Sequence, residues 1–183
     1  MFFKKKNKEI VKLCVTLYKL IVKQSRTKEF YLNLKIHDTI DGRFELIILH
    51  FFLLERTLDK EIKKDQLIYK ELLEIMYKDF DMSLREIGVG DLSVGKKIYQ
   101  MTEAFSGRLF AYRKFNNKKN YKIIGPTVKR NIYGTVDNID AKYVEIIKSY
   151  IVDSMEYIDK SLIYEVSKNS SIFNDLNRYI INK

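Results

Sequence analysis

The chain has 183 residues, 46% of them hydrophobic, so it is long enough to enclose a substantial core, and its net charge is +10 at pH 7. Its single cysteine, Cys14, excludes an internal disulfide bond, and two histidines far apart in the sequence argue against a zinc site. We expect one domain spanning residues 1–183, with no metal and no cofactor.

The positive charge is distributed unevenly. Residues 1–28 contain nine Lys or Arg and one acid, residues 104–136 contain eight and no acid, and the rest of the chain is net negative. Basic regions of this kind indicate contact with phosphate, in RNA or at an anionic membrane surface, and we expect no DNA partner. Drift in an AT-rich genome would give the same charge without a function, so both interpretations stay open. The basic surface that we assign comprises Lys4, Lys5, Lys6, Arg113, Lys114, Lys118, Lys119, Lys122, Lys129 and Arg130.

No segment has the length of a membrane span. The longest uncharged apolar run covers residues 46–54, whereas a transmembrane helix needs about 20 residues. The N-terminal apolar stretch is interrupted by Lys12 and Lys19 and has no small-residue cleavage site, so we do not expect a signal peptide.

The first half of the chain has helical periodicity. Ile10, Cys14, Leu17 and Ile21 form one apolar stripe over residues 8–24, and a short segment follows at 27–34. We expect a helix over residues 43–61, capped by Asp41 and apolar on nearly all sides, which is typical of a central core helix. The lone histidine in this helix, His50, is more typical of a satisfied core residue than of a proton carrier or ligand.

The second half continues the same pattern. A helix begins near residue 65 and is interrupted near 79–83, and a longer one covers 92–115, in which Gly95 and Gly107 would allow close helix approach. Residues 116–121 form a basic polar loop, and Gly125 and Pro126 introduce a short helix over 127–133. Apolar spacing predicts another helix over 144–158 and a weaker one over 171–181. The fold class is therefore all-α, a single-domain bundle of about six to seven helices.

The chain is organised around the glycines at positions 88 and 90. Gly88 suits the left-handed position after a helix, Arg85 faces the negative end of that helix, and Asp91 is placed to cap the next one. This predicts two helices joined by a Gly-Val-Gly elbow. Residues 90–97 are one residue from a phosphate-binding P-loop, but Lys97 replaces the required Ser or Thr and the preceding residues are predicted to be helical. We therefore favour a Gly-Asp helix start, and a nucleotide-binding enzyme is the third and weakest hypothesis.

No set of residues is typical of a catalytic centre. The acids at positions 79, 81, 86 and 91 could hold a cation, but charge at helix ends more often forms caps and ion pairs. Aromatic and basic residues alternate over 105–133 and could stack on bases, although Phe105 and Tyr112 lie on the predicted buried stripe. We expect no catalytic residue.

The sequence resembles the ubiquinol–cytochrome c chaperone family over residues 17–134. The likeness lies in ordered blocks at 17–18, 24–26, 30–31, 38–45 and 49–50, then 104–108, 111–112 and 129–134, and it is strongest at the elbow, Asp-Met-Ser-Leu-Arg-Glu-Ile-Gly-Val-Gly-Asp-Leu-Ser-Val-Gly-Lys over 81–96. Lys28 stands where the family usually has proline, and Ser106 where it has an aromatic residue. The basic segment 1–28 overlaps the family-like region 17–134, and the tail over 140–183 resembles no family that we can name.

The resemblance implies a non-enzymatic assembly factor. Members of the family hold newly made cytochrome b and promote assembly of ubiquinol–cytochrome c reductase, respiratory complex III; mitochondrial members act near the ribosomal tunnel exit, and some need a small partner subunit. It implies cytochrome b as client, ribosomal RNA and a small subunit as further partners, and a place in the bacterial cytoplasm, peripheral on the inner membrane, or on the matrix side in a mitochondrion. The alternative is a basic ribosome- or RNA-binding module without a membrane-protein client.

Charge concentrated around a rigid elbow suggests where a client or partner would bind. We predict a binding surface that comprises Asp38, Asp41, Arg43, Arg85, Glu86, Asp91, Lys96 and Arg108.

Overall fold

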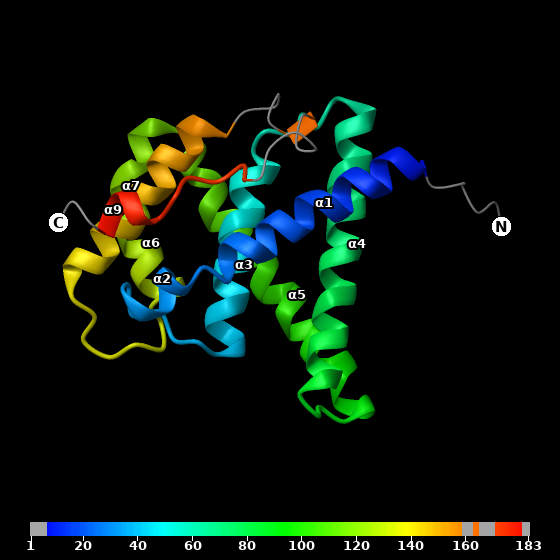
Figure 1. Ribbon diagram of the computed structural model, residues 1–183, viewed down its shortest axis with the longest axis horizontal. Coiled ribbons are helices and arrows are strands. Elements are labelled where there is room, and N and C mark those ends of the chain that lie inside the picture. Colours follow the sequence, from blue (N-terminus) through cyan, green and yellow to red (C-terminus); the bar gives the residue numbers. More distant parts are fainter. Residues whose placement is uncertain (1–6, 159–162, 165–170, 181–183) are drawn as a thin grey trace.

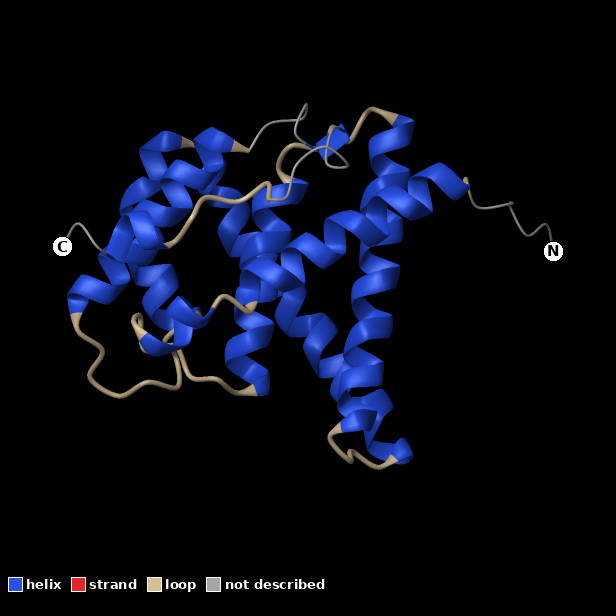
Figure 2. Cartoon of the chain, in the orientation of Figure 1, coloured by secondary structure: helices blue, strands red, loops and turns tan. Residues whose placement is uncertain are grey.

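The computed structural model describes residues 7–158, 163–164 and 171–180, and every regular element within these ranges is helical (Figures 1 and 2). This confirms the all-α class. The helices are α1 (Lys8–Ser25), α2 (Lys28–Leu32), α3 (Ile40–Glu55), α4 (Lys63–Glu86), α5 (Asp91–Arg113), α6 (Ile124–Asn131), α7 (Ala141–Tyr157) and α9 (Asn177–Ile180), with two short 3₁₀ helices, η1 (Lys114–Asn116) and η2 (Lys118–Ile123).

Helix α3 is the centre of the core. Every residue from Phe44 to Glu55 is buried, as expected for a helix that is apolar nearly all round. It packs against α1, α5 and α7, while α4 packs on α1 and α5 (Figure 1). Cys14 on α1 is fully buried, which confirms it as a core residue. Within the described ranges, no helix is long and apolar enough to cross a membrane.

Both ends of α3 differ from the prediction. The cap is Thr39, whose Oγ1 accepts a hydrogen bond from the backbone N–H of Gly42 at 3.1 Å, and Asp41 lies in the first turn instead. The helix ends at Glu55, not near residue 61. The reason is the buried Asp65 carboxylate, which accepts from the backbone N–H of Asp59 at 2.8 Å and fixes a turn there.

Other boundaries also shift. Helix α4 runs without the interruption predicted at 79–83, and α5 ends at Arg113 before the 3₁₀ turn η1. The predicted loop at 116–121 is largely the 3₁₀ helix η2, and α6 begins at Ile124 rather than 127, with Pro126 in its first turn where no N–H is needed. Of the predicted helix over 171–181, the structure has α9 alone; Ile181 lies outside the described residues.

Two glycines do not have the predicted role. A Cβ atom placed on Gly95 or Gly107 would meet no atom within 4 Å, so neither permits a close helix crossing. The close approach occurs at Gly42, where a Cβ atom would collide with the carbonyl oxygen of His37.

His50 is confirmed as a satisfied core residue. Its Nδ1 lies 2.7 Å from the Leu46 carbonyl oxygen, which can only accept, so Nδ1 carries the proton and Nε2 accepts from the Tyr150 hydroxyl at 2.8 Å. Gln24 donates to the same hydroxyl and to the Asn174 carbonyl, each at 3.1 Å. Burial lowers the pKa of His50 to about 3, so the ring is neutral. This His50 network joins α1, α3, α7 and the C-terminal segment.

Candidate functional site

Helices α4 and α5 form a hairpin that extends beyond the rest of the body (Figure 1). The turn occupies residues 87–90. The Val89 N–H bonds the Leu84 carbonyl and the Gly88 N–H bonds the Arg85 carbonyl, which is the Schellman arrangement. It requires a left-handed residue, and Gly88 has φ +85°. The residues at this end of the hairpin, 81–92, are called the hairpin tip below.

The charges of the hairpin tip form one exposed cluster. Arg85 donates to Asp81 through Nε at 2.6 Å and also contacts Asp91. The hydrogen bonds that Arg85 donates to the Asp81 carboxylate lower the pKa of Asp81 and raise the pKa of Arg85. Asp91 was expected to cap α5, but the cap residue is Gly90, which has no side chain, and the Asp91 carboxylate turns to Arg85 instead. The guanidinium therefore links the last turn of α4 to the first turn of α5.

Large apolar side chains accompany these charges. Met82 and Ile87 are 58% and 55% exposed, and Leu92 has no contact that covers it. Leu84 and Val94, by contrast, point inward and are buried. The hairpin tip thus presents apolar side chains and a compensated charge cluster to solvent on the same short segment.

A groove lies between the first turns of α3, the middle of α5 and the end of α6, with a volume of about 680 Å³. Asp41 and Glu45 from α3 line it, together with Lys97 and Arg108 from α5 and Arg130 from α6. Arg108 binds Glu45 at 2.8 Å, and the Glu45 side chain is 8% exposed. Burial raises the pKa of Glu45 even though Arg108 opposes this shift. We call this hollow the α3–α5–α6 groove.

A second, smaller hollow lies between α3 and the end of α4. Arg43 from α3 and Glu86 from α4 line it, and Asp79 on α4 accepts from the Tyr18 hydroxyl of α1 at 2.8 Å nearby. Arg43 also pairs with Asp38 at 2.6 Å, with both side chains about half exposed. The two hollows adjoin, because both are lined by Ile40, Phe44, Leu84 and Met101.

Seven of the eight residues of the predicted binding surface therefore fall into three adjacent places. Arg85 and Asp91 lie at the hairpin tip, and Asp41 and Arg108 line the α3–α5–α6 groove. Arg43, its partner Asp38 and Glu86 belong to the second hollow, while Lys96 is exposed on α5 and lines neither hollow. Sequence patterns did not assign Glu45, Lys97 and Asn131 to a binding surface, because their proximity depends on how α3, α5 and α6 pack.

The predicted basic surface is divided as well. Arg113 forms a two-pronged ion pair with Glu55, at 2.9 and 3.1 Å, and this pairing raises the pKa of Arg113. Lys118 lies 3.3 Å from Glu156. Lys114, Lys119 and Lys122 are exposed along η1 and η2, and Lys129 and Arg130 lie on α6. Lys4, Lys5 and Lys6 fall outside the described residues.

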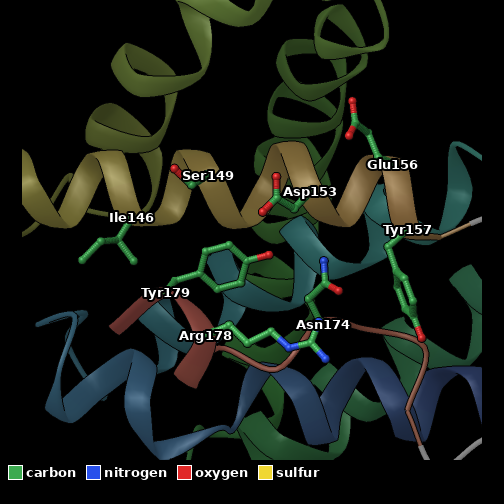
Figure 3. Close-up of a pocket in the computed structure, with 8 residues that line it drawn as sticks. All are labelled: Ile146, Ser149, Asp153, Glu156, Tyr157, Asn174, Arg178 and Tyr179. Atoms are coloured by element: carbon green, nitrogen blue, oxygen red, sulfur yellow. The ribbon is translucent and has the colours of Figure 1, made fainter. Parts of the chain in front are cut away.

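A further hollow of about 620 Å³ lies between α7 and the C-terminal segment (Figure 3). Its residues, which the sequence did not single out, include Ser149 and Asp153 on α7 and Asn174, Arg178 and Tyr179 opposite them. Burial, with a contribution from Asp153, raises the pKa of Tyr179 to about 12. Tyr179 and Asn174 also contact the His50 network, so this hollow borders a structural contact.

The geometry of the described residues supports neither a metal site nor a P-loop. Across the part of the chain that the structure describes, no three His, Cys, Asp or Glu side chains are placed to hold a metal ion. Residues 90–97, which resemble a P-loop, follow a helix and form the first two turns of α5, so the strand that such a loop requires is not there.

Comparison with known proteins identifies the family. The model of the ubiquinol-cytochrome C chaperone family matches residues 32–163, which include the hairpin, the groove and α7. The chain belongs to this family. The match begins after α1 and continues into the segment that resembled nothing known, up to residue 163. A search of the curated proteins found no match for the chain.

A solved structure has the same fold as this family member. The crystal structure of the Cbp3 homolog from Brucella abortus superimposes with a TM-score of 0.76 and 24% sequence identity, and the match covers 93% of each chain. A match over 93% of the chain is longer than residues 32–163, so the shared fold extends beyond the segment that the family model matches.

Proposed function

We propose that this protein is a non-enzymatic chaperone that binds newly made cytochrome b and promotes assembly of ubiquinol–cytochrome c reductase. Membership of the ubiquinol-cytochrome C chaperone family supports a role in assembling that complex. The observation that supports client binding is the hairpin tip, where Met82, Ile87 and Leu92 are exposed beside the cluster around Arg85. We propose this tip, with the neighbouring residues of the predicted surface, as the client-binding site.

The composition of the hairpin tip suits a hydrophobic client. Apolar side chains left in solvent on a protruding segment can cover part of an apolar helix, which gains free energy as that surface leaves water. The ion pairs of Arg85 with Asp81 and Asp91 keep the two helix ends together while the apolar side chains are in contact with the client. Such a site needs no chemical step, in keeping with a binding protein.

The decisive experiment is depletion of this protein in its own organism. We expect a selective loss of cytochrome b and of ubiquinol–cytochrome c reductase, measured by haem absorbance and immunoblot against a second respiratory complex as control. Unchanged cytochrome b would reject the proposed client. An equal loss of both complexes would indicate a general effect on translation or on the membrane, and would also reject it.

The site is tested separately by reversing its charges. The double substitution Arg85→Glu and Asp91→Lys keeps opposite charges across the turn but reverses the pattern that a client meets. Leu92→Asp removes an exposed apolar group without touching the core. We expect each variant to fold and to lose co-purification with cytochrome b. Retained co-purification in both folded variants would show that the client binds elsewhere, while the depletion result would still stand.

The alternative is binding to ribosomal RNA through the basic surface. It draws support from the exposed lysines of η1 and η2, and its contacts would be to phosphate. Binding through several phosphates weakens steeply as salt rises, whereas an apolar grip on a client does not. Measuring ribosome and client binding between 50 and about 300 mM salt separates the two. A small partner subunit and peripheral contact with the inner membrane remain part of this proposal.

A further inference from the structure

We propose that the α3–α5–α6 groove binds an extended, acidic peptide segment of a partner protein. The assignment does not depend on the client being cytochrome b, because it rests on the groove alone. Three features of the groove carry it: an unsatisfied buried carboxylate oxygen, two cations without a counter-charge, and an apolar wall beside them. Of these cations, Arg130 donates through Nε to the neutral side-chain oxygen of Asn131 at 3.3 Å.

The unsatisfied oxygen belongs to Glu45. Its Oε1 accepts two hydrogen bonds from Arg108, through Nε at 3.0 Å and a terminal nitrogen at 2.8 Å, whereas Oε2 has no donor anywhere in the described chain. Glu45 as a whole is only 6% exposed. A buried acceptor left without a donor costs free energy, so a ligand that supplies an N–H or O–H group at this point is favoured.

A second buried polar atom in the same wall is a hydrogen-bond donor rather than an acceptor. The side-chain nitrogen of Asn131 is buried and makes no hydrogen bond of normal geometry; it interacts with the Tyr112 hydroxyl, which is itself buried without a full hydrogen bond. One atom of the groove lacks a hydrogen-bond donor and another lacks an acceptor in normal geometry. The alternating N–H and C=O groups of an extended polypeptide backbone can supply both. A free anion would satisfy Asn131 but not Glu45.

The charge of the groove selects an acidic ligand. Lys97 and Arg130 are exposed at its rim, and neither forms an ion pair with a carboxylate within residues 7–158, 163–164 and 171–180. Arg108 is the third cation, against the two acids Asp41 and Glu45. Carboxylate side chains on the ligand would pair with Lys97 and Arg130 in a partly sheltered site, where such contacts are stronger than in open solvent.

The remaining wall is apolar and distinguishes a peptide from RNA. Met101, Ala104 and Ile132 line it, which suits apolar side chains that alternate with acids along an extended strand. A nucleic acid would bring phosphates close to the Asp41 and Glu45 carboxylates. It would also find no exposed aromatic ring for stacking, since Phe44, the one aromatic side chain that lines the groove, is 7% exposed.

The test uses the full chain and a defined probe. The probe is a pool of fluorescein-labelled octapeptides in which Asp or Glu alternates with randomised Leu, Val and Ala, and binding is followed by anisotropy. A matched pool carries Asn and Gln in place of Asp and Glu. We expect the acidic pool to bind at least tenfold more tightly than the amide pool. Equal binding of the two pools, or no binding of the acidic pool, would overturn the proposal.

Substitutions then locate the binding. The change Lys97→Glu with Arg130→Glu should lower affinity for the acidic pool more than tenfold. The matched control, Lys63→Glu with Lys70→Glu, makes the same change of charge on exposed residues of α4 outside the groove and should leave affinity unchanged.

The competing occupants give different results. An equal loss of affinity in the control pair would mean that net charge attracts the probe, and it would overturn the groove assignment. Binding of an octanucleotide RNA that depends on Lys97 and Arg130 while the acidic pool fails to bind would replace a peptide with nucleic acid as the ligand. Circular dichroism and unfolding by urea verify that each variant folds.

Discussion

Polar side chains at the centre of the molecule and polar side chains at its edge are arranged in different ways. Around His50 both ring nitrogens, the Tyr150 hydroxyl and the Gln24 amide have hydrogen-bond partners, and the chain of hydrogen bonds joins three helices to the C-terminal segment. In the α3–α5–α6 groove, Glu45 keeps a free oxygen and two cations have no counter-charge among the described residues. At the hairpin tip the charges are paired, but the apolar side chains are not covered.

This difference separates structure from function within one fold. A closed network lowers the free energy of the folded state and leaves nothing for a ligand to satisfy. An unsatisfied or uncovered group costs stability when alone and gains free energy when a partner supplies what is missing. Substitutions in the first region should therefore change stability, and substitutions in the groove and hairpin tip should change binding while the fold persists.

The strongest test of the comparison is His50→Ala. The substitution leaves a cavity in α3 and removes a partner from the Tyr150 hydroxyl, so we expect a loss of about 4 kcal/mol in the free energy of unfolding. The measurement is urea unfolding at pH 7. The control is His37→Ala, which removes an exposed histidine and should change stability by less than about 0.5 kcal/mol. Similarly small effects of both substitutions would mean that the His50 network contributes little to the free energy of unfolding.

The next effect concerns the pair of Arg113 and Glu55. Arg113→Ala leaves the Glu55 side chain, which is 6% exposed, buried without its counter-charge, and we expect a loss of about 3 kcal/mol. Arg43→Ala breaks an ion pair whose two side chains are about half exposed and screened by water, so its cost should stay within about 0.5 kcal/mol. If thermal unfolding showed the same loss of stability in Arg113→Ala and Arg43→Ala, burial would not be what distinguishes the two ion pairs.

Acid should weaken the centre through His50. Burial lowers its pKa to about 3 in the folded state, against about 6.5 when unfolded. The neutral ring thus favours the folded state fully above pH 6.5, and this contribution is lost as pH falls from 6.5 towards 3, by about 1.4 kcal/mol for each pH unit. The stability difference between the wild type and His50→Gln should shrink by about 2 kcal/mol between pH 7 and pH 5. A constant difference would contradict the buried, neutral assignment.

Local pattern predicted the fold well and the groove poorly. The stripe of α1, the all-round apolar character of α3 and the turn at Gly88 depend on residues close in sequence, and the structure agrees with each. The pairs of Arg108 with Glu45 and of Arg113 with Glu55 join residues 63 and 58 positions apart, and they depend on how α5 lies against α3. Sequence alone therefore identified Arg108 and Arg113 as charged groups but not which carboxylates they meet.

The cap of α3 was missed for a related reason. Thr39 and Asp41 are both acceptable caps by residue type, and in the structure Asp41 and Gly42 already lie in the first turn, where the Gly42 N–H donates to the Thr39 hydroxyl. Gly95 and Gly107 were misread because a helical glycine is often, but not always, a contact point. Here nothing approaches either of them.

The glycines supply the smallest and most direct test. Gly88→Ala forces a side chain into a backbone with φ +85° and should cost about 1 kcal/mol. Gly107→Ala adds a methyl group to the exposed face of α5, where a Cβ meets nothing within 4 Å, and should raise stability by up to about 1 kcal/mol. Urea unfolding of both variants measures the sign of the change in the free energy of unfolding. A loss of stability in Gly107→Ala would mean that another helix or a second chain packs there in solution. The face of α5 that contains Gly107 would then be buried, like the core around His50.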